Sequence, residues 1–403
     1  MIACLLPLIL GVPLSIRRAQ VDISPPEPLP LGGYTDRHGK LMDRGGEPLY
    51  TRCILLQQGE KKIAVVSAEM LTIPESLIRE VSTRIGPNIH LFLQATHTHS
   101  APDSQMLNDR MTFGIPGIAT YRKRWLSWYA DQIATCIQDA ERGDAFEPKS
   151  LWMSTYTKAA NRPRRTGGTP DQRNIVVSWS KFPSRGNIVF SFFTAHPTIY
   201  DETRNQTSGD WIGELANRTG ALVLNGAIGD VSPYSEGKDG EARMRSFFSR
   251  FDAKAKGKTE RFFSESGQLN WIEEPIELDP MKPHPTFAKE NGIPEALAEN
   301  LVSRFAPPKA TIRAFRLGDL TVVGVPGEPT SILDKQIQQA GKRLGLNSVL
   351  VCSHVDGWMG YILDPKDYAR GGYEATLSFY GANEGDLVVK AATNALRGLA
   401  QHK

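Results

Sequence analysis

The sequence predicts one large α/β domain in which buried, mixed sheets are flanked by helices. Three observations support this fold class. The chain has 403 residues, which is long enough to bury a substantial core. Short apolar runs alternate with helical patterns, and no low-complexity tract or internal repeat interrupts them. With 40% hydrophobic and 23% charged residues, the composition is that of a globular protein and not of a disordered one.

A β-α-β unit is predicted in the first hundred residues. Residues 62–68 and 89–95 are short apolar runs, and residues 74–85 between them carry apolar side chains at helical spacing. Such a unit places two parallel strands in a sheet that is covered on both faces. Two further strands, at residues 17–23 and 50–57, precede it and are separated by a proline-rich loop.

The same patterns continue toward the C-terminus. Residues 120–140 predict a long amphipathic helix, and we assign its Trp125 and Trp128 to the core because they fall near helical spacing. Further strands are predicted at residues 151–156, 175–180, 188–195, 221–225, 311–317, 321–325 and 348–352.

Residues 235–307 differ from the rest of the chain because they are rich in charged residues, including the lysine-rich run at 254–258. We interpret this segment as an insertion or lid and not as a second core. The sequence therefore predicts a single domain over residues 19–403 that contains this one large insertion.

The N-terminal residues 2–14 are apolar enough for a signal-peptide core, but no basic residue precedes them and no clear cleavage site follows. We treat residues 1–18 as a signal or N-terminal extension and favour a secreted or periplasmic location over the cytoplasm. No later apolar run approaches the roughly 20 residues of a membrane helix, so we expect membrane contact to be peripheral at most.

Charge and cysteine content exclude several classes of protein. The 47 basic and 44 acidic residues nearly balance, and no basic stripe is interleaved with aromatic residues, so nucleic acid is not an expected partner. The four cysteines show no close pairing that would predict a zinc knuckle or a disulfide framework.

Histidines follow two of the predicted strands. His97 and His99 come directly after the strand at 89–95, and in extended geometry their side chains project to the same side. His196 follows the strand at 188–195 in the same way. Because functional groups gather where such strands end, we predict that one imidazole of the pair binds a metal while the other acts beside it.

A zinc site needs a further donor and one open position for water, whose pKa the metal lowers to about 7. Glu328 is the candidate, because it stands directly after the predicted strand at 321–325. The alternative interpretation is a glutamate at a helix N-terminus, where the helix dipole favours a carboxylate.

Several separated motifs occur in a fixed order and cover about residues 18–385. They are Val21-Asp22-Ile23-Ser24, Thr96-His97-Thr98-His99-Ser100, Asn161-Arg162, His196-x-Thr198 with Ser208-Gly209-Asp210, Asn225-Gly226-Ala227 with Gly229-Asp230, Pro326-Gly327-Glu328, Gly360-Tyr361 and Tyr373-Glu374. In these motifs the chain resembles the catalytic domain of the neutral, non-lysosomal ceramidases.

The resemblance implies one zinc ion per chain and hydrolysis of the amide bond of ceramide or a related N-acyl lipid by a zinc-activated water. The zinc ligands that it implies are His97, His196, Glu328 and Tyr361. The residues that it places around the reacting amide are His99, Arg162 and Tyr373. In that case His99 protonates the leaving amine, and Tyr373, with Arg162 or His99, stabilises the oxyanion. Without the resemblance, both tyrosines would be interpreted as packing residues.

The chain also departs from the family pattern. It ends thirty residues after Tyr373, so we expect it to lack the C-terminal immunoglobulin-like domain of that family. Arg162 is followed by Arg164 and Arg165, which could bind a carboxylate or phosphate. Two alternatives therefore stay open: a zinc deacylase or esterase that acts on a polar or anionic acyl substrate, and a catalytically silent lipid-binding homologue.

Three further residues near these motifs have possible roles. Ser232 is not favoured as a nucleophile, because the G-x-S-x-G elbow of serine hydrolases is missing around it. Asp210 and Glu69 are candidates for orienting a ligand histidine through its second ring nitrogen.

Overall fold

Three sheets form the centre of the structure, a computed structural model that describes residues 12–255, 257–264 and 267–401. The first sheet contains, in spatial order, β1 (Leu14–Asp22), β2 (Tyr50–Gln58), β3 (Lys61–Ala68) and β4 (His90–Ala95). Its last two strands run parallel and are joined by α1 (Glu75–Ile85). The predicted β-α-β unit is therefore confirmed.

The other two large sheets also combine parallel and antiparallel pairs. The second contains β11 (Gly257–Ser264), β5 (Ser150–Thr157), β7 (Arg173–Ser178), β8 (Ile188–Phe193) and β9 (Leu222–Asn225). The third contains β12 (Leu269–Ile276), β13 (Ala310–Leu317), β14 (Leu320–Gly324) and β16 (Ser348–Cys352). The parallel pairs are β8 with β9 and β14 with β16.

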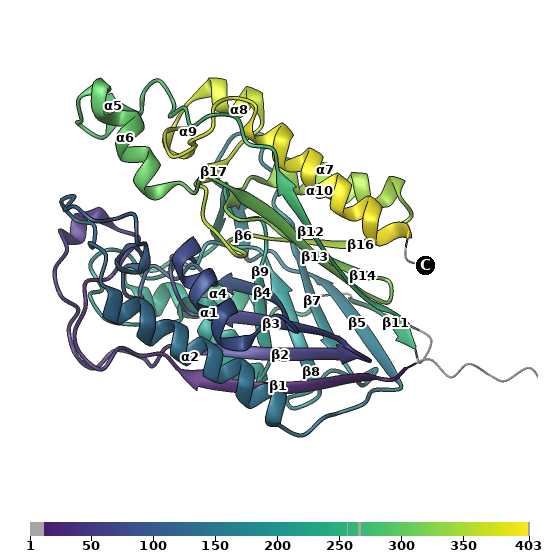
Figure 1. The fold of residues 1–403 in the computed structure, drawn as a ribbon. Coiled ribbons are helices and arrows are strands. Elements are labelled where there is room, and N and C mark those ends of the chain that lie inside the picture. The colour runs from purple at the N-terminus through teal and green to yellow at the C-terminus, as the bar shows by residue number, and fades with distance from the viewer. Residues whose placement is uncertain (1–11, 256, 265–266, 402–403) are drawn as a thin grey trace, which may run out of the picture.

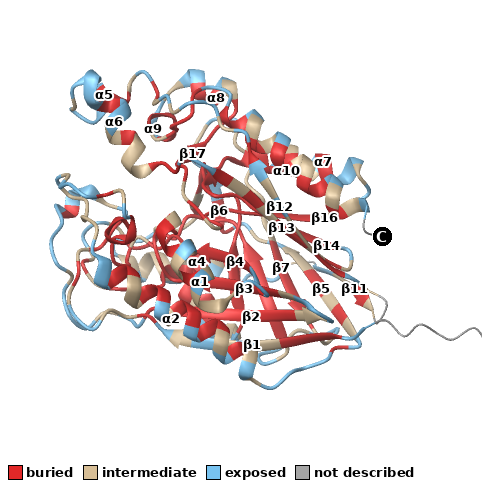
Figure 2. Cartoon of the chain, viewed as in Figure 1, coloured by how far each residue is buried: buried red, intermediate tan, exposed pale blue. Residues whose placement is uncertain are grey.

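The three sheets share one hydrophobic core. Phe92, Phe192 and Phe315 come from different sheets, and all three are buried in the same cluster. Phe92 and Phe315 meet edge to face with ring centroids 5.3 Å apart, a favourable aromatic geometry. Figure 2 shows the resulting concentration of buried residues in the strands.

Helices cover the outer faces of the sheets (Figure 1). The first sheet packs against α1 and α2 (Lys123–Arg142), the second against α3 (Asp210–Thr219) and α4 (Gly240–Phe251), and the third against α7 (Ser331–Arg343) and α10 (Glu384–Gln401). Within α2, Trp125 is buried and Trp128 packs against the same core. The predicted class, a mixed α/β domain with sheets flanked by helices, is confirmed.

The charged segment 235–307 is divided between two environments. Its strands β11 and β12 lie at the edges of the second and third sheets, and edge strands tolerate charged side chains because one side faces solvent. The helices α5 (Phe287–Glu290) and α6 (Glu295–Phe305) lie outside the sheets (Figure 1). Within the same segment α4 packs against the second sheet, and the interpretation of residues 235–307 as an insertion or lid stays a prediction.

At the N-terminus, β1 begins at Leu14, inside the segment that we interpreted as an extension, and Leu14 and Ile16 are buried in the common core. The first eleven residues of that segment lie outside the described residues. Of the cysteines that the structure describes, Cys53, Cys136 and Cys352 are buried and free. Within the described part of the chain, each helix is too short or too polar to cross a membrane.

Candidate metal centre

The candidate site lies where strands from all three sheets end. His97 follows β4, His196 follows β8, Glu328 follows β14, and His354 follows β16. Each of these strands belongs to a parallel pair, and functional side chains gather at the carboxyl ends of parallel strands. His97 and His354 have φ angles of 69° and 54°, a left-handed conformation that is uncommon outside glycine and is concentrated at functional sites.

A buried polar network holds these strand ends together. The Gln94 side-chain amide donates to the carbonyls of Asn225 and Ser353, both at 2.7 Å, and accepts from the Asn225 backbone N–H at 3.0 Å. The Asn225 side chain in turn donates to the carbonyl of Thr96 at 3.2 Å. One network therefore connects the ends of β4, β9 and β16, from which His97 and His354 project.

We expect Gln94→Met to lower the free energy of unfolding by about 2–4 kcal/mol. Methionine has a volume similar to that of glutamine, but it leaves the three buried backbone groups that Gln94 contacts without hydrogen-bond partners. Urea denaturation measures this change. Gln339→Met, on an exposed position of α7, is the matched control and should change stability by less than about 0.5 kcal/mol. An equally small effect of Gln94→Met would show that the network does not stabilise the strand ends.

Four donor atoms converge beside these strand ends. The Glu328 carboxylate is 1% exposed, and its Oε2 lies 3.1 Å from His196 Nε2 and 3.7 Å from His97 Nε2. The Tyr361 hydroxyl, on β17 (Tyr361–Ile362), lies 3.4 Å from His196 Nε2. Four donors at 2.0–2.2 Å from a tetrahedral zinc ion are separated by about 3.3–3.6 Å. The observed separations of 3.1, 3.4 and 3.7 Å are centred on that spacing, and the first and last fall slightly outside it.

Hydrogen bonds orient the rings of His97 and His196 so that the Nε2 lone pair of each ring faces Glu328. His97 Nδ1 lies 2.8 Å from the carbonyl of Leu71, and His196 Nδ1 lies 3.2 Å from the carbonyl of Val231. Because a carbonyl only accepts, each ring donates from Nδ1 and presents an unprotonated Nε2. Glu328 Oε2 has no hydrogen-bond donor among the described residues. Lone pairs that face a buried carboxylate repel it, and a cation between them removes this repulsion.

The ionisation states favour a metal ion over a proton in this position. Burial, followed by the charge of Arg164, lowers the pKa of His196 to about 3. Burial also lowers the pKa of His97, so both rings are neutral near pH 7. For Glu328 burial raises the pKa of the carboxyl, and positive charge at the positions of the surrounding imidazoles lowers it well below its ordinary value. A neutral imidazole pair with a carboxylate is a donor set that zinc prefers.

The sequence analysis did not identify His354. Its ring is fully buried and lies flat on that of His97, with centroids 4.0 Å apart, and neither ring nitrogen has a hydrogen-bond partner within the described chain. Its Nε2 lies 3.6 Å from Glu328 Oε1, an oxygen that already accepts from Trp358 Nε1 at 3.0 Å. The signal was present in the sequence, because His354 follows a predicted strand at the same interval as His97.

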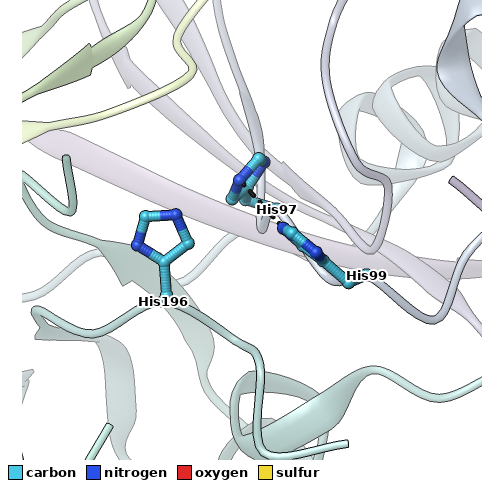
Figure 3. A group of neighbouring side chains, drawn as sticks. All are labelled: His97, His99 and His196. Carbon is cyan, nitrogen blue, oxygen red and sulfur yellow. Dashed lines mark hydrogen bonds between the residues drawn. The ribbon is translucent and has the colours of Figure 1, made fainter. Parts of the chain in front are cut away.

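Two overlapping groups of side chains could therefore hold a metal ion. In each group the donor atoms lie within 4.8 Å of one another. The groups are His97 with His99 and His196, and His97 with Glu328 and His354. Figure 3 shows the three rings of the first group, which come from the ends of β4 and β8.

His99 lies beside this centre. Its Nε2 is 3.2 Å from His97 Nε2, while its ring centroid is 6.2 Å from that of His196. Tyr34 packs edge-on against the His99 ring, and the Arg37 guanidinium donates to the His99 carbonyl, so the loop before β2 fixes the position of this histidine. His99 is half-buried, in contrast to the two flanking histidines.

The two predicted tyrosines occupy different depths. Tyr361 is buried next to His196, whereas Tyr373, the first residue of α9 (Tyr373–Thr376), is 60% exposed. Their rings still meet edge to face, with centroids 5.8 Å apart. Tyr373 therefore lies on the solvent-exposed side of the centre, and Tyr361 lies in its buried part.

The structure separates the arginines of β6 (Asn161–Pro163) and the loop after it. The Arg162 side chain is exposed on β6 and forms no side-chain hydrogen bond or ion pair with any described residue. Arg164 instead places its Nη1 3.5 Å from both the Tyr361 hydroxyl and His196 Nε2. Of the residues expected around the reacting amide, His99 and Tyr373 border the centre, and the nearby guanidinium belongs to Arg164.

The remaining candidates have structural contacts. Asp210 accepts from the backbone N–H groups of Ile199 and Tyr200 and not from a histidine ring, and Glu69 pairs with Arg52. Backbone carbonyls therefore take the orienting role that we predicted for these two carboxylates. The Ser232 hydroxyl, on β10 (Val231–Pro233), accepts from Arg164 Nε at 2.8 Å.

Together, the fold and the site define a mixed α/β protein with a buried histidine–carboxylate centre at its strand ends. The fold is similar to that of the neutral ceramidase from Pseudomonas aeruginosa, with a TM-score of 0.74 and 15% sequence identity over 97% of this chain and 75% of that chain. A ceramidase complexed with C2 matches with a TM-score of 0.75 and 16% identity over 97% of this chain and 76% of that one. No protein-family model and no curated protein matches the sequence. The resemblance to neutral ceramidases is thereby confirmed at the level of the fold.

Proposed function

We propose that this protein is a zinc-dependent hydrolase that cleaves the amide bond of ceramide or a related N-acyl lipid. The main support is the buried Glu328 carboxylate, whose Oε2 faces the unprotonated ring nitrogens of His97 and His196 and has no hydrogen-bond donor among the described residues. The fold shared with neutral ceramidases is consistent with this activity.

In this proposal His97, His196, Glu328 and Tyr361 hold one zinc ion. When bound, zinc polarises a substrate carbonyl and lowers the pKa of a water molecule to about 7. The carbonyls of Leu71 and Val231 fix the tautomer and ring orientation of the two histidines, a role that such outer partners fulfil in many metal sites.

Two residues next to the centre act on the substrate. His99 accepts a proton from the attacking water and passes it to the leaving amine, a transfer that a positioned imidazole performs. The Tyr373 hydroxyl donates to the oxyanion. Tyrosine ordinarily has a pKa of about 10, so this hydroxyl keeps its proton near neutral pH. For Arg162, which is exposed, the resemblance is the only support.

The fourth donor can be tested, because Tyr361 and His354 have different contacts. The Tyr361 hydroxyl lies beside His196 Nε2, the nitrogen that is next to Glu328 Oε2, whereas His354 faces Oε1, which accepts from Trp358. We expect Tyr361→Phe to weaken zinc binding at least about tenfold and His354→Asn to change it less than about threefold. Competition with a chromogenic chelator measures both, and the reverse order would assign the fourth position to His354.

The direct test of function is an activity screen of the zinc-loaded protein on amides of graded acyl length and head-group charge. We expect release of fatty acid from at least one N-acyl amide or ceramide. If lipid binds without hydrolysis across the panel although zinc is present, the protein is a silent lipid-binding homologue. We keep the secreted or periplasmic location as part of the proposal, and fractionation of expressing cells tests it.

A further inference from the structure

We propose that the preferred substrate carries a carboxylate on the amine side of the scissile amide, as an N-acyl amino acid does, and that Arg164 binds this carboxylate. This inference rests on the proposed amide hydrolysis and specifies its substrate class. It follows from the different environments of Arg164 and Arg165, from the position of Arg164, and from the charge of the centre.

The charge of Arg165 is already neutralised inside the protein. Its side chain is 8% exposed, and Nη1 donates to Glu374 Oε2 at 2.9 Å. The second terminal nitrogen donates to the carbonyls of Asp367 and Gly371, at 2.8 and 2.9 Å. Arg165 therefore ties the chain before α9 to the rest of the domain, and both of its terminal nitrogens are occupied.

Arg164 is held in place without a compensating charge. Its backbone N–H donates to the carbonyl of Asp230 at 2.6 Å, and its Nε donates to the Ser232 hydroxyl at 2.8 Å. No Asp or Glu carboxylate within the described ranges lies within 4.0 Å of its guanidinium, in contrast to Arg165. A fixed guanidinium with an unpaired charge is well suited to binding a planar carboxylate.

The position of Arg164 defines which part of a substrate it can reach. Its Nη1 lies 3.5 Å from the Tyr361 hydroxyl and from His196 Nε2, two of the donors of the candidate centre. In an N-acyl amino acid the carboxylate is two bonds from the amide nitrogen, so a carboxylate on Arg164 keeps the scissile carbonyl next to that centre. The hydroxyl groups of a ceramide offer no negative charge at this point.

The charge of the centre also favours an anionic substrate. Glu328 is the carboxylate that contacts the donor histidines. A divalent ion bound beside it, together with Arg164, would leave an excess of positive charge over this one carboxylate. Such an excess is costly unless an anion accompanies it.

The test compares N-dodecanoylglycine with N-dodecanoylethanolamine, which replaces the carboxylate by a neutral hydroxymethyl group. We expect the wild-type protein to prefer the glycine compound at least about tenfold in kcat/KM, since a hydrogen bond to a charged group contributes about 1.5–3 kcal/mol. Arg164→Gln should lose this preference, mainly through a higher KM for the glycine compound. Arg370→Gln removes the same charge from an exposed position on α8 (Pro365–Arg370) and should retain the preference.

Several outcomes would overturn the inference. Equal losses on both compounds in Arg164→Gln would mean that Arg164 serves the reaction and not the carboxylate, and a wild-type protein without preference would contradict the substrate class. Loss of preference in Arg162→Gln, with Arg164→Gln unaffected, would assign the carboxylate to Arg162.

Binding keeps the inference testable if hydrolysis fails. Absence of turnover on every compound would contradict the proposed function alone. Calorimetric titration of the zinc-free protein then compares the same two compounds. Tighter binding of N-dodecanoylglycine that disappears in Arg164→Gln supports the inference, and equal binding of both compounds overturns it.

Discussion

The His196→Ala protein is expected to bind almost no zinc and to hydrolyse its substrate at least about a hundredfold more slowly. Loss of an outer partner of a metal ligand already costs about 10–100-fold, so loss of a ligand should cost more. His196 is fully buried, and its Nε2 lies closer to the Glu328 carboxylate, at 3.1 Å, than the ring nitrogens of His97 and His354 do. Its removal leaves this carboxylate facing only His97 and Tyr361 in the proposed donor set.

The metal content of the purified variant, measured by mass spectrometry, checks this expectation together with steady-state rates. His90→Ala is the matched control, because it removes an exposed imidazole from the first residue of β4 and should change neither quantity by more than about twofold. A His196→Ala protein that carries a full equivalent of zinc would exclude His196 as a ligand.

His99→Ala is expected to retain zinc and to lose about 10²–10⁴-fold in rate, the range that a positioned acid–base group contributes. The His99 ring lies against His97, but its centroid is 6.2 Å from that of His196, and the residue is more exposed than either. The proposal assigns His97 to the metal and His99 to the substrate.

Single-turnover kinetics at saturating zinc, with the metal content of the same sample, separate these two roles. Loss of zinc from both His97→Ala and His99→Ala would mean that the pair forms one ligand set and that the division is wrong. An undiminished rate in zinc-loaded His99→Ala would remove His99 from the proton transfer.

Much of the fold could be predicted from the sequence, because its strands are short apolar runs with clear ends. The strand at 348–352 has the same bounds in the structure as β16. β11 and β12 were not predicted as strands, because edge strands carry charged residues on the side that faces solvent and lose the apolar signal.

Less of the candidate site than of the fold could be predicted from the sequence. His97, His196 and Glu328 could be proposed from their places after predicted strands. The position of His354 depends on contacts between the chain after β16 and the end of β4, where the His354 carbonyl accepts from the Ala95 N–H and its ring stacks on that of His97. The choice between the neighbouring arginines likewise depends on tertiary structure. Strand β6 pairs with β10, and Arg162 lies opposite Ser232 in this pair. Arg164 lies in the loop that follows β6, and its side chain extends toward the centre.

The most direct measurement is the zinc dependence of amide hydrolysis by the full-length protein. After dialysis against a chelator, the rate on the best N-acyl amide should fall at least about a hundredfold and return in proportion to added zinc up to about one equivalent per chain. Metal-free protein that retains its full hydrolytic rate would contradict the account.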